Sequence, residues 1–405
     1  MQYPIIIIGG GAAGLMAAVT AAKMGKKVLV LEKMPRPARK IMITGKGRCN
    51  LTNNTDEKTL IANVCRNGRF LYSAFAAFNA DDTMRFFEDA GVPLKTERGN
   101  RVFPVSDKSV DIVDALVNSA KAAGVKILNK QVSQIVCNDG VVTAVKTVDG
   151  MIFDCQKVLI ATGGLSYPTT GSTGDGFEFA RQLGHTVIPP RPSLVSMQVY
   201  EGYVQSLAGL SLKNVALTVT NNGKTSFNGQ GEMLFTHTGI SGPLVLTASA
   251  LIDEVGDCKA FIDLKPALSE EQLDKRLLRD FEQNKNKELQ NSLDDLLPKK
   301  LILPLIQSAG VNPKVKVNAL TKQQRQDIVK TLKALPLTVT ALGSFNEAVI
   351  TRGGVSIKEI DPKTMASKLV DGLYFAGEVI DVDAFTGGFN LQIAFSTGYL
   401  AGENI

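Results

Sequence analysis

The sequence contains few of the residues that build metal sites and disulfides. Its 405 residues include no tryptophan, two histidines and five cysteines, and no two cysteines are spaced as CxxC. Structural zinc sites take four Cys or His ligands at short spacings, so we predict no metal site. An odd number of scattered cysteines is typical of a reducing compartment. We therefore expect a cytoplasmic protein without disulfides.

Long apolar runs and dense charge of one sign are also absent. No window approaches the ~18 consecutive apolar residues that a membrane helix needs. Residues 5–8 are apolar but have no basic leader, so we interpret them as a buried strand and not as a signal peptide. The net charge is +6, and basic residues gather only in short patches. This mildly basic surface suits an anionic dinucleotide, and we expect neither a membrane nor a nucleic acid as partner.

Glycine, by contrast, is plentiful: the 37 glycines gather in short motifs. The first motif, at residues 9–14, reads Gly-x-Gly-x-x-Gly, follows an apolar strand predicted over residues 4–8 and opens an alanine-rich helix predicted over residues 12–24. Such glycines permit a tight turn, close approach of a pyrophosphate and close helix–strand packing. A second strand over residues 27–31 ends at Glu32, whose carboxylate can accept hydrogen bonds from a ribose. We predict a βαβ unit that binds a dinucleotide at a helix N-terminus.

Two further glycine motifs favour FAD over a nicotinamide dinucleotide as the bound cofactor. Three short β segments over residues 131–154 precede a strand that ends at residues 162–164, and a third motif at residues 372–378 ends in Gly377 and Glu378. No second Gly-x-Gly-x-x-Gly unit forms a separate NAD(P)H domain. We therefore predict non-covalent FAD as the cofactor and NAD(P)H as a transient co-substrate.

The pattern changes near residue 190. Antiparallel strands joined by Gly and Asn turns follow, as in a small barrel. Residues 268–334 then turn helical, with capping boxes at Ser269–Gln272 and Thr321–Gln324. We predict an α/β fold, a Rossmann-like FAD-binding domain with an inserted antiparallel β-barrel that carries a small helical subdomain. The predicted boundaries are 1–190 with 358–405 for the FAD-binding domain, 191–266 with 335–357 for the barrel, and 267–334 for the helical insert.

Several long motifs resemble one known family. Residues 43–53 resemble the flavin-proximal loop of the BaiN/YhiN-type NAD(P)/FAD-dependent oxidoreductases. The resemblance extends over almost the full length, at residues 162–168, 171–176, 234–243, 377–383 and 386–392. It implies a glutathione-reductase-like FAD domain with barrel and helical inserts, and it makes reduction of conjugated double bonds in oxidised bile-acid intermediates a candidate activity. Lys46 departs from the family pattern, in which a glycine is common, and adds a positive charge near the flavin or the phosphates.

The candidate cofactor-binding residues come from these motifs. Lys46 and Arg48 can neutralise the pyrophosphate or the reduced flavin, and Asn50 can donate to carbonyl oxygens. The first amides of a final helix opened by Gly388 can face the flavin ring. Cys49 has no partner cysteine nearby, so a packed thiol is favoured over a disulfide-reductase role. The predicted set is Gly9, Gly11, Ala13, Gly14, Glu32, Lys33, Gly45, Lys46, Gly47, Arg48, Cys49, Asn50, Val132, Ala161, Thr162, Gly163, Gly377, Glu378, Gly388, Asn390 and Leu391.

Three residues are candidates for the chemistry at the substrate. His237 and Tyr167 are testable as proton donors, and Arg352 can bind an anionic group. A structural hydrogen bond or a solvated loop position is the competing interpretation for each of them.

The function predicted from these motifs is that of an FAD-dependent oxidoreductase. It would pass hydride from NAD(P)H via flavin to a small unsaturated organic acceptor, such as a conjugated enone of the oxidised bile-acid type. The alternatives are a flavoprotein reductase fed by a protein or quinone donor, an RNA-modifying flavoprotein, and a non-catalytic flavin-binding scaffold. No pattern in the sequence predicts an oligomeric state.

Overall fold

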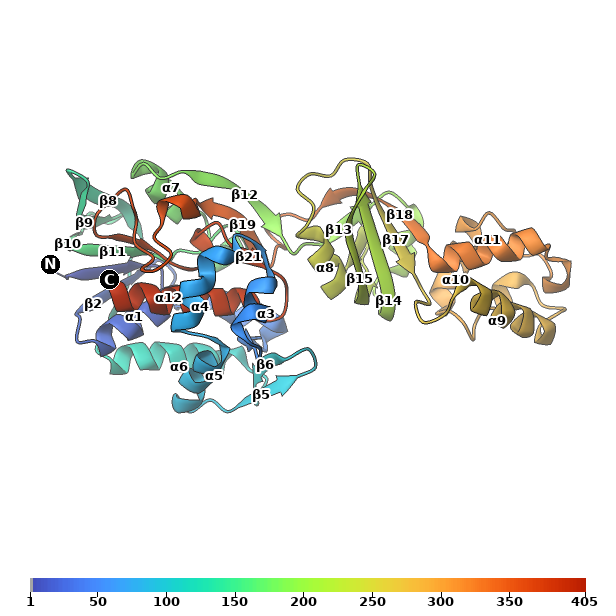
Figure 1. The fold of residues 1–405 in the computed structure, drawn as a ribbon, viewed down its shortest axis with the longest axis horizontal. Coiled ribbons are helices and arrows are strands. Elements are labelled where there is room, and N and C mark those ends of the chain that lie inside the picture. The colour runs from blue at the N-terminus through green and yellow to red at the C-terminus, as the bar shows by residue number, and fades with distance from the viewer. Residues whose placement is uncertain (1–2) are drawn as a thin grey trace. The chain divides into compact units, whose positions relative to one another are not determined.

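The computed structural model describes residues 3–405 and divides the chain into two compact units (Figure 1). Unit 1 combines the chain up to Ser193 with Phe345–Ile405. Unit 2 is Leu194–Ser344. Unit 2 is therefore one continuous segment that is inserted between the two parts of unit 1.

Unit 1 is built on a five-stranded parallel sheet with the strand order β20-β11-β1-β2-β7. Its central strands are buried on both faces, which explains why they appear in the sequence as continuous apolar runs instead of alternating patterns. The predicted Rossmann-type fold is confirmed. The strands are β1 (Ile5–Ile8), β2 (Val28–Glu32), β7 (Lys126–Asn129), β11 (Lys157–Ile160) and β20 (Leu373–Phe375).

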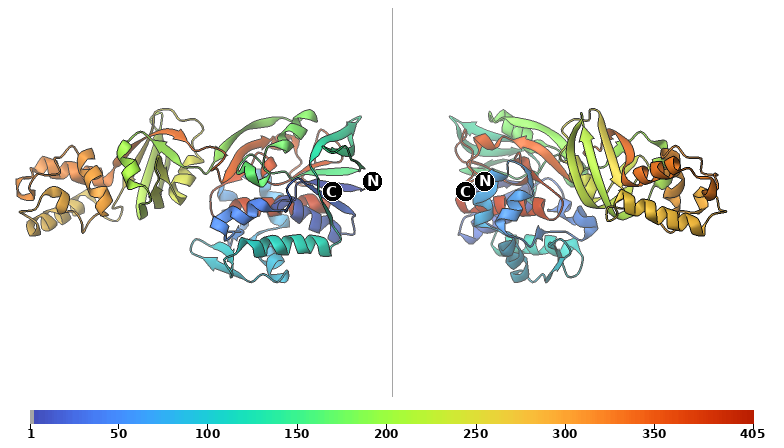
Figure 2. Two further views of the ribbon diagram at one scale, coloured as in Figure 1. Left: turned by 180° about the vertical axis from the view of Figure 1, so that it is seen from behind. Right: turned by 45° about the vertical axis from the view of Figure 1, so that its right-hand side comes forward.

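Two helices from opposite ends of the chain pack against each other beside this sheet. Helix α1 (Ala12–Lys23) follows the first glycine motif, and α12 (Phe389–Asn404) is the last element. Figures 1 and 2 show them side by side. At Gly402 a Cβ would lie only 2.6 Å from the Ala17 carbonyl oxygen. Small residues on both helices thus permit backbone contact, and the end of the chain becomes part of the first motif's support.

Smaller elements complete unit 1. The predicted β segments over 131–154 are confirmed as a three-stranded sheet of β8 (Val132–Asn138), β9 (Val141–Thr147) and β10 (Ile152–Asp154). The other small sheets are β3 (Thr52–Asn53) with β6 (Arg101–Pro104) and β5 (Leu94–Glu97), β4 (Val64–Arg66) with β21 (Asp383–Ala384), and β12 (Val187–Ser193) with β19 (Ile350–Val355). The remaining helices are α2 (Arg39–Ile43), α3 (Glu57–Ala62), α4 (Tyr72–Ala77), α5 (Ala80–Asp89), α6 (Ser109–Ala122) and α7 (Asp175–Gln182).

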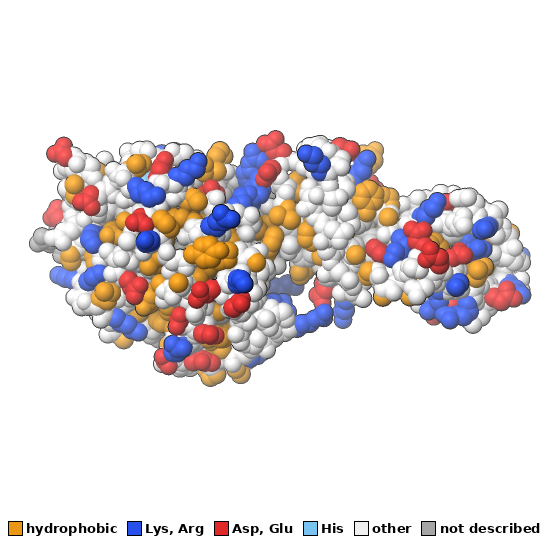
Figure 3. Space-filling view, viewed as in Figure 1, with side chains coloured by type: hydrophobic (Ala, Val, Ile, Leu, Met, Phe, Trp, Pro, Cys, Tyr) orange, Lys and Arg blue, Asp and Glu red, His pale blue; other side chains and the backbone are white. Residues whose placement is uncertain are grey.

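Unit 2 contains the predicted antiparallel barrel, which is closed, with the strand order β13-β16-β15-β14-β17-β18. Both predicted capping boxes are confirmed, at Ser269 and Thr321. Figure 3 shows acidic and basic side chains mixed over the helices of this unit. The strands are β13 (Met197–Val199), β14 (Ser211–Asn221), β15 (Lys224–Phe235), β16 (Gly239–Ser241), β17 (Cys258–Asp263) and β18 (Leu335–Leu342), and the helices are α8 (Pro243–Ser249), α9 (Glu270–Gln283), α10 (Lys299–Ser308) and α11 (Lys322–Lys333).

The structure places two boundaries differently from the sequence prediction. Residues 335–357 were assigned to the barrel, but strand β19 pairs with β12, with Arg352 opposite Arg191, and belongs to unit 1. The helices of residues 267–334 share one continuous core with the barrel, in which Leu277 and Leu332 pack in the same cluster as Leu335. Barrel and helices therefore form a single unit with a shared core. In the described part of the chain, no helix is long and apolar enough to cross a membrane.

His185, one of the two histidines, lies buried just after the end of helix α7. Its Nε2 is 2.9 Å from the Ser367 hydroxyl, its Nδ1 is 3.3 Å from Glu359, and its ring packs edge-on against Phe375. Burial lowers the pKa of His185, and the nearby Glu359 carboxylate offsets this only in part.

We expect this histidine to make unit 1 less stable in mild acid. The unfolded chain protonates the imidazole below a pH of about 6.5 and the folded chain resists it, so the free energy of unfolding should fall as pH drops through that value. The slope should reach at most about 1.4 kcal/mol per pH unit. Denaturant unfolding at several pH values checks this. His185→Gln should lose the slope and the exposed His237→Gln should keep it; equal slopes in wild type and His185→Gln would contradict the prediction.

Candidate functional site

The first glycine motif forms an open cradle at the N-terminus of α1. Gly9 has φ +102°, and a Cβ there would lie 2.5 Å from the Ala161 carbonyl oxygen. A Cβ at Gly14 would overlap the Gly9 carbonyl. At Gly11, in contrast, a Cβ would meet no atom within 4 Å. Helix α1 has no side-chain cap and no acidic residue in its first turn, so its first N–H groups are left for an anion.

A cavity at the carboxyl ends of β1 and β2 brings together five of the predicted residues. The Glu32 carboxylate accepts from the N–H groups of Gly10 and Met34, both at 2.7 Å. These bonds fix the carboxylate and leave lone pairs for a ribose. The Thr162 hydroxyl is buried, and it has no hydrogen-bond partner among the described residues. An orphaned buried hydroxyl in a cavity wall fits a polar ligand. The five residues are Gly9, Glu32, Lys33, Val132 and Thr162.

Lys33 crosses the edge of this cavity. Its ammonium lies 2.7 Å from Asp175 and also contacts Thr173. Asp175 lies in the first turn of α7, and the residue that caps this helix is Gly174, with φ +85°. Asp175 therefore serves to hold Lys33 in place.

The third glycine motif abuts the first. Gly377 has φ +75°, and a Cβ there would lie 2.8 Å from the Cβ of Ala13. The Glu378 carboxylate accepts from the Ser166 hydroxyl at 2.7 Å and the Thr351 N–H at 2.8 Å, and it pairs with Lys40 at 2.5 Å. These three partners were not predicted from the sequence. Ser166 lies within the motif at residues 162–168, whereas no motif contains Lys40 or Thr351. Lys40 lies two residues after Ala38, whose N–H binds the Gly10 carbonyl.

The loop at residues 43–53 has an unusual backbone. Gly45, Lys46, Gly47 and Cys49 all have positive φ. Lys46, at a position where the resembled family commonly has glycine, adopts φ +59°, which costs a residue with a Cβ roughly 1 kcal/mol. The side-chain oxygen Oδ1 of Asn50 is buried without a hydrogen-bond partner among the described residues. An acceptor left in this state is suited to a ligand that donates a hydrogen bond. The expected donation from Asn50 to carbonyl oxygens stays a prediction.

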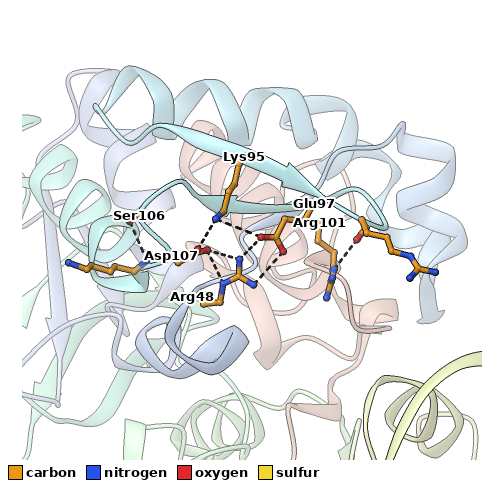
Figure 4. Close-up of polar contacts among 8 residues, drawn as sticks. Arg48, Lys95, Glu97, Arg101, Ser106 and Asp107 are labelled. Carbon is orange, nitrogen blue, oxygen red and sulfur yellow. Dashed lines mark hydrogen bonds and ion pairs between the residues drawn. The ribbon is translucent and has the colours of Figure 1, made fainter. Parts of the chain in front are cut away.

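Arg48 occupies a network that the sequence did not predict (Figure 4). Its Nε and Nη2 lie 2.8 and 2.6 Å from Asp107, and Nη2 also pairs with Glu97. Lys95 binds Asp107 at 2.7 Å, and the guanidinium lies 4.2 Å from the centre of the Phe103 ring. Hydrogen bonds from Arg48 hold the pKa of Glu97 below its ordinary value. Arg48 thus ties the loop to the β5–β6 hairpin, and its neutralisation of FAD stays a prediction.

The predicted residues at the start of helix α12 differ in what they contact. Gly388 caps α12 with φ +100°, and a Cβ there would overlap the Thr52 backbone. Helix α12 has no side-chain cap and no acid in its first turn, so no side chain caps its first amides, including that of Leu391. That these amides face the flavin ring stays a prediction. The Asn390 side chain instead binds the N–H and carbonyl of Ala384, at 2.9 and 2.8 Å. Its amide holds strand β21, which makes Asn390 a structural residue in this structure.

Cys49 is a fully buried thiol. Burial raises the pKa of Cys49 to about 12. Because the thiolate is the reactive form, we expect alkylation of Cys49 in the folded protein at pH 8 to be at least about 1,000-fold slower than alkylation of a free cysteine. Timed iodoacetamide labelling followed by peptide mass spectrometry measures this. Unfolded protein, in which Cys49 should label at the ordinary rate, is the control, and rapid labelling of the folded protein would contradict a packed thiol.

The three candidates for substrate chemistry lie in different surroundings. Arg352 is buried on β19, with a carboxylate cluster beside it. Tyr167 is half-buried with φ +52°, and its N–H binds the Phe345 carbonyl at 3.2 Å. His237 is exposed between β15 and β16 and belongs to unit 2, whereas the glycine motifs belong to unit 1. Ala161 and Gly163 line the end of β11, where Gly163 has φ +74°.

These features define a class: a flavin-dependent oxidoreductase with a Rossmann-type nucleotide-binding domain. The chain belongs to the HI0933-like protein Rossmann domain family, whose model matches residues 3–404. The predicted resemblance is thereby confirmed.

Characterised relatives cover almost the whole chain. The chain is 35% identical to the ribosomal RNA dihydrouridine synthase of Haemophilus influenzae, over 99% of this chain and 98% of that protein. It is 31% identical to the 3-dehydro-bile acid delta(4,6)-reductase of Clostridium scindens, over 98% and 97%. Among solved structures, the 3-ketosteroid-delta4-(5alpha)-dehydrogenase of Rhodococcus jostii covers 100% of this chain and 96% of its own at 16% identity, with a TM-score of 0.52, a likeness of fold.

Proposed function

We propose that this protein uses FAD to move hydride from NAD(P)H to a carbon–carbon double bond conjugated with a carbonyl group. The observation that supports the cofactor is the first glycine motif: it leaves open space at Gly11, and its Gly9 abuts Thr162, whose hydroxyl has no partner among the described residues. Gly11, Glu32, Thr162 and the α12 amides would hold the FAD. When bound, FAD supplies the hydride, and the protein orients it and excludes water. The two relatives support the acceptor, because dihydrouridine formation and delta(4,6) reduction both saturate a double bond of an unsaturated carbonyl system.

An anaerobic titration tests the donor. We expect NADH or NADPH to bleach the visible flavin band of the purified protein, and the faster of the two to be the donor. A conjugated enone added afterwards should restore the colour. Dithionite provides the control for full reduction. A protein that dithionite bleaches but neither nucleotide does would favour the alternative of a protein or quinone donor.

A uracil ring in ribosomal RNA is a second candidate acceptor. It is favoured by the 35% identity to a ribosomal RNA dihydrouridine synthase over nearly the full length of both chains. This relative argues against our expectation that no nucleic acid takes part. On the face of the molecule drawn in Figure 3, however, acidic and basic side chains are mixed and form no broad basic surface. Reduced enzyme should be given ribosomal RNA and a bile-acid-type enone in parallel. Mass spectrometry then shows which substrate gains two hydrogens, and gain by RNA alone would overturn the small-molecule assignment.

A further inference from the structure

A second charged group is buried in unit 1, outside the glycine motifs. The Asp383 side chain on β21 is 1% exposed. It accepts from the Ser193 hydroxyl at 3.2 Å, and both of its oxygens lie 3.5 Å from Arg66 Nη1 on β4. The buried Arg352 on β19 also acts on it electrostatically. Strands β4, β12, β19 and β21 therefore converge on one buried carboxyl.

Stability does not explain this burial. Removing a carboxylate and guanidiniums from water costs several kcal/mol per ion, and apolar residues of similar size often serve a fold equally well. The two contacts between Arg66 and Asp383 are both 3.5 Å long, at the outer limit of a hydrogen bond. Buried charges with a specific partner and no stabilising role mark functional positions. A chemical use for the carboxyl gives a reason for its position that stability alone does not supply.

The charged and titratable groups around Asp383 affect the pKa of its carboxyl. Burial raises the pKa of Asp383, and Arg66, the Ser193 hydroxyl and Arg352 lower it only in part. Burial likewise raises the pKa of the neighbouring Asp381, whose carboxylate binds Asn67 at 3.0 Å. Cys65 on β4 has its pKa raised to about 12, so it stays a thiol and adds no negative charge. Arg191 lies opposite Arg352 in the β12–β19 ladder.

Asp383 is also fixed relative to the last glycine motif. The next residue, Ala384, is held at both its N–H and its carbonyl by Asn390, in the first turn of α12. Between them Gly387 and Gly388 have φ of +135° and +100°. Asp383 therefore directly precedes a clamped segment that ends at the α12 amides, which we expect to face the flavin ring.

We propose that Asp383 is the acid that holds, at a carboxyl oxygen, the proton needed by the reduction, with Arg66 and Arg352 as positioning residues. The inference rests on the proposed function. Saturating the double bond adds a hydride to one carbon and a proton to the other. The hydride comes from the reduced cofactor, the proton leaves Asp383, and the resulting carboxylate is stabilised by the two guanidiniums. Water then returns the proton to the carboxylate, and the neighbouring Arg66 side chain is 31% exposed.

Carboxyl NMR tests the protonation itself, without turnover. In protein labelled with ¹³C at aspartate carboxyls, the resonance that disappears in Asp383→Asn should titrate above the ordinary aspartate value of about 3.9. Asp81→Asn, on the exposed side of α5, provides the control and should remove a different resonance. An Asp383 resonance that titrates at or below the ordinary value overturns the inference.

Stopped-flow kinetics test the role. Asp383→Asn should slow reoxidation by the conjugated acceptor about 100-fold, the lower range for a general acid, and leave reduction by NAD(P)H unchanged. Asp383→Glu should recover part of the rate and replaces the Asn variant if that fails to fold. Equal slowing of both half-reactions, or of neither, overturns the inference. Wild-type enzyme that reduces no conjugated acceptor overturns the proposed function instead, and the NMR result then separates the two failures.

Discussion

Replacing Gly11 by valine is expected to abolish FAD binding and to leave the fold of unit 1 intact. The backbone at this position has φ −85° and ψ −166°, which a β-branched residue adopts without strain. A Cβ there meets no protein atom within 4 Å, so the side chain enters the space in front of the α1 amides. We expect the dissociation constant for FAD to rise at least about 100-fold, or about 2.7 kcal/mol.

Matched variants at the same motif separate ligand loss from fold loss. Gly14→Val should damage the fold itself, because a Cβ there overlaps the Gly9 carbonyl. Gly25→Ala, at a positive φ on the far end of α1, should cost some stability and keep the flavin. Flavin content of the purified proteins and their circular dichroism measure both effects. A yellow Gly11→Val protein with full occupancy would mean that the cofactor binds elsewhere.

Local patterns in the sequence predicted the Rossmann-type sheet and the barrel. Four consecutive isoleucines followed by glycines predict a strand and turn with no knowledge of the rest of the chain, and capping boxes at Ser269 and Thr321 mark helix starts within four residues. Such signals are short-range, and the structure confirms them. The segment between residues 52 and 104 gave no comparable signal, because its strands of two to four residues are too short for a period to show.

The electrostatics of the site could not be predicted in the same way. Lys40 and Glu378 are 338 residues apart in sequence, and Arg48 and Glu97 are 49 apart. Which carboxylate neutralises which cation is decided by the tertiary fold and by no motif. The same holds for Asp383, an ordinary acid in the sequence that becomes distinctive only when β4, β12 and β19 enclose it. Strand β19 was likewise assigned to the barrel because its partner β12 lies over 150 residues earlier.

The Lys40–Glu378 pair gives the largest expected effect on stability. The two side chains are 23% and 13% exposed, and the carboxylate also holds the Ser166 hydroxyl and the Thr351 N–H. Glu378→Ala leaves a mostly buried ammonium without its counter-charge, with the Ser166 hydroxyl as its remaining acceptor, and removes the acceptor of two donors. Breaking such a pair from one side typically costs about 3–5 kcal/mol, and we expect a loss of this size in denaturant unfolding of unit 1 without cofactor.

A double variant distinguishes the structural role of Glu378 from its predicted contact with FAD. Lys40→Met combined with Glu378→Gln removes both charges and keeps the shapes, so most of the lost stability should return. If Glu378 also accepts a hydrogen bond from the cofactor, this stable double variant should still bind FAD about 10-fold more weakly, the effect of one charge-assisted hydrogen bond of about 1.4 kcal/mol. Unchanged FAD affinity would assign Glu378 to the protein alone, and a Glu378→Ala protein as stable as wild type would show that Lys40 finds water instead.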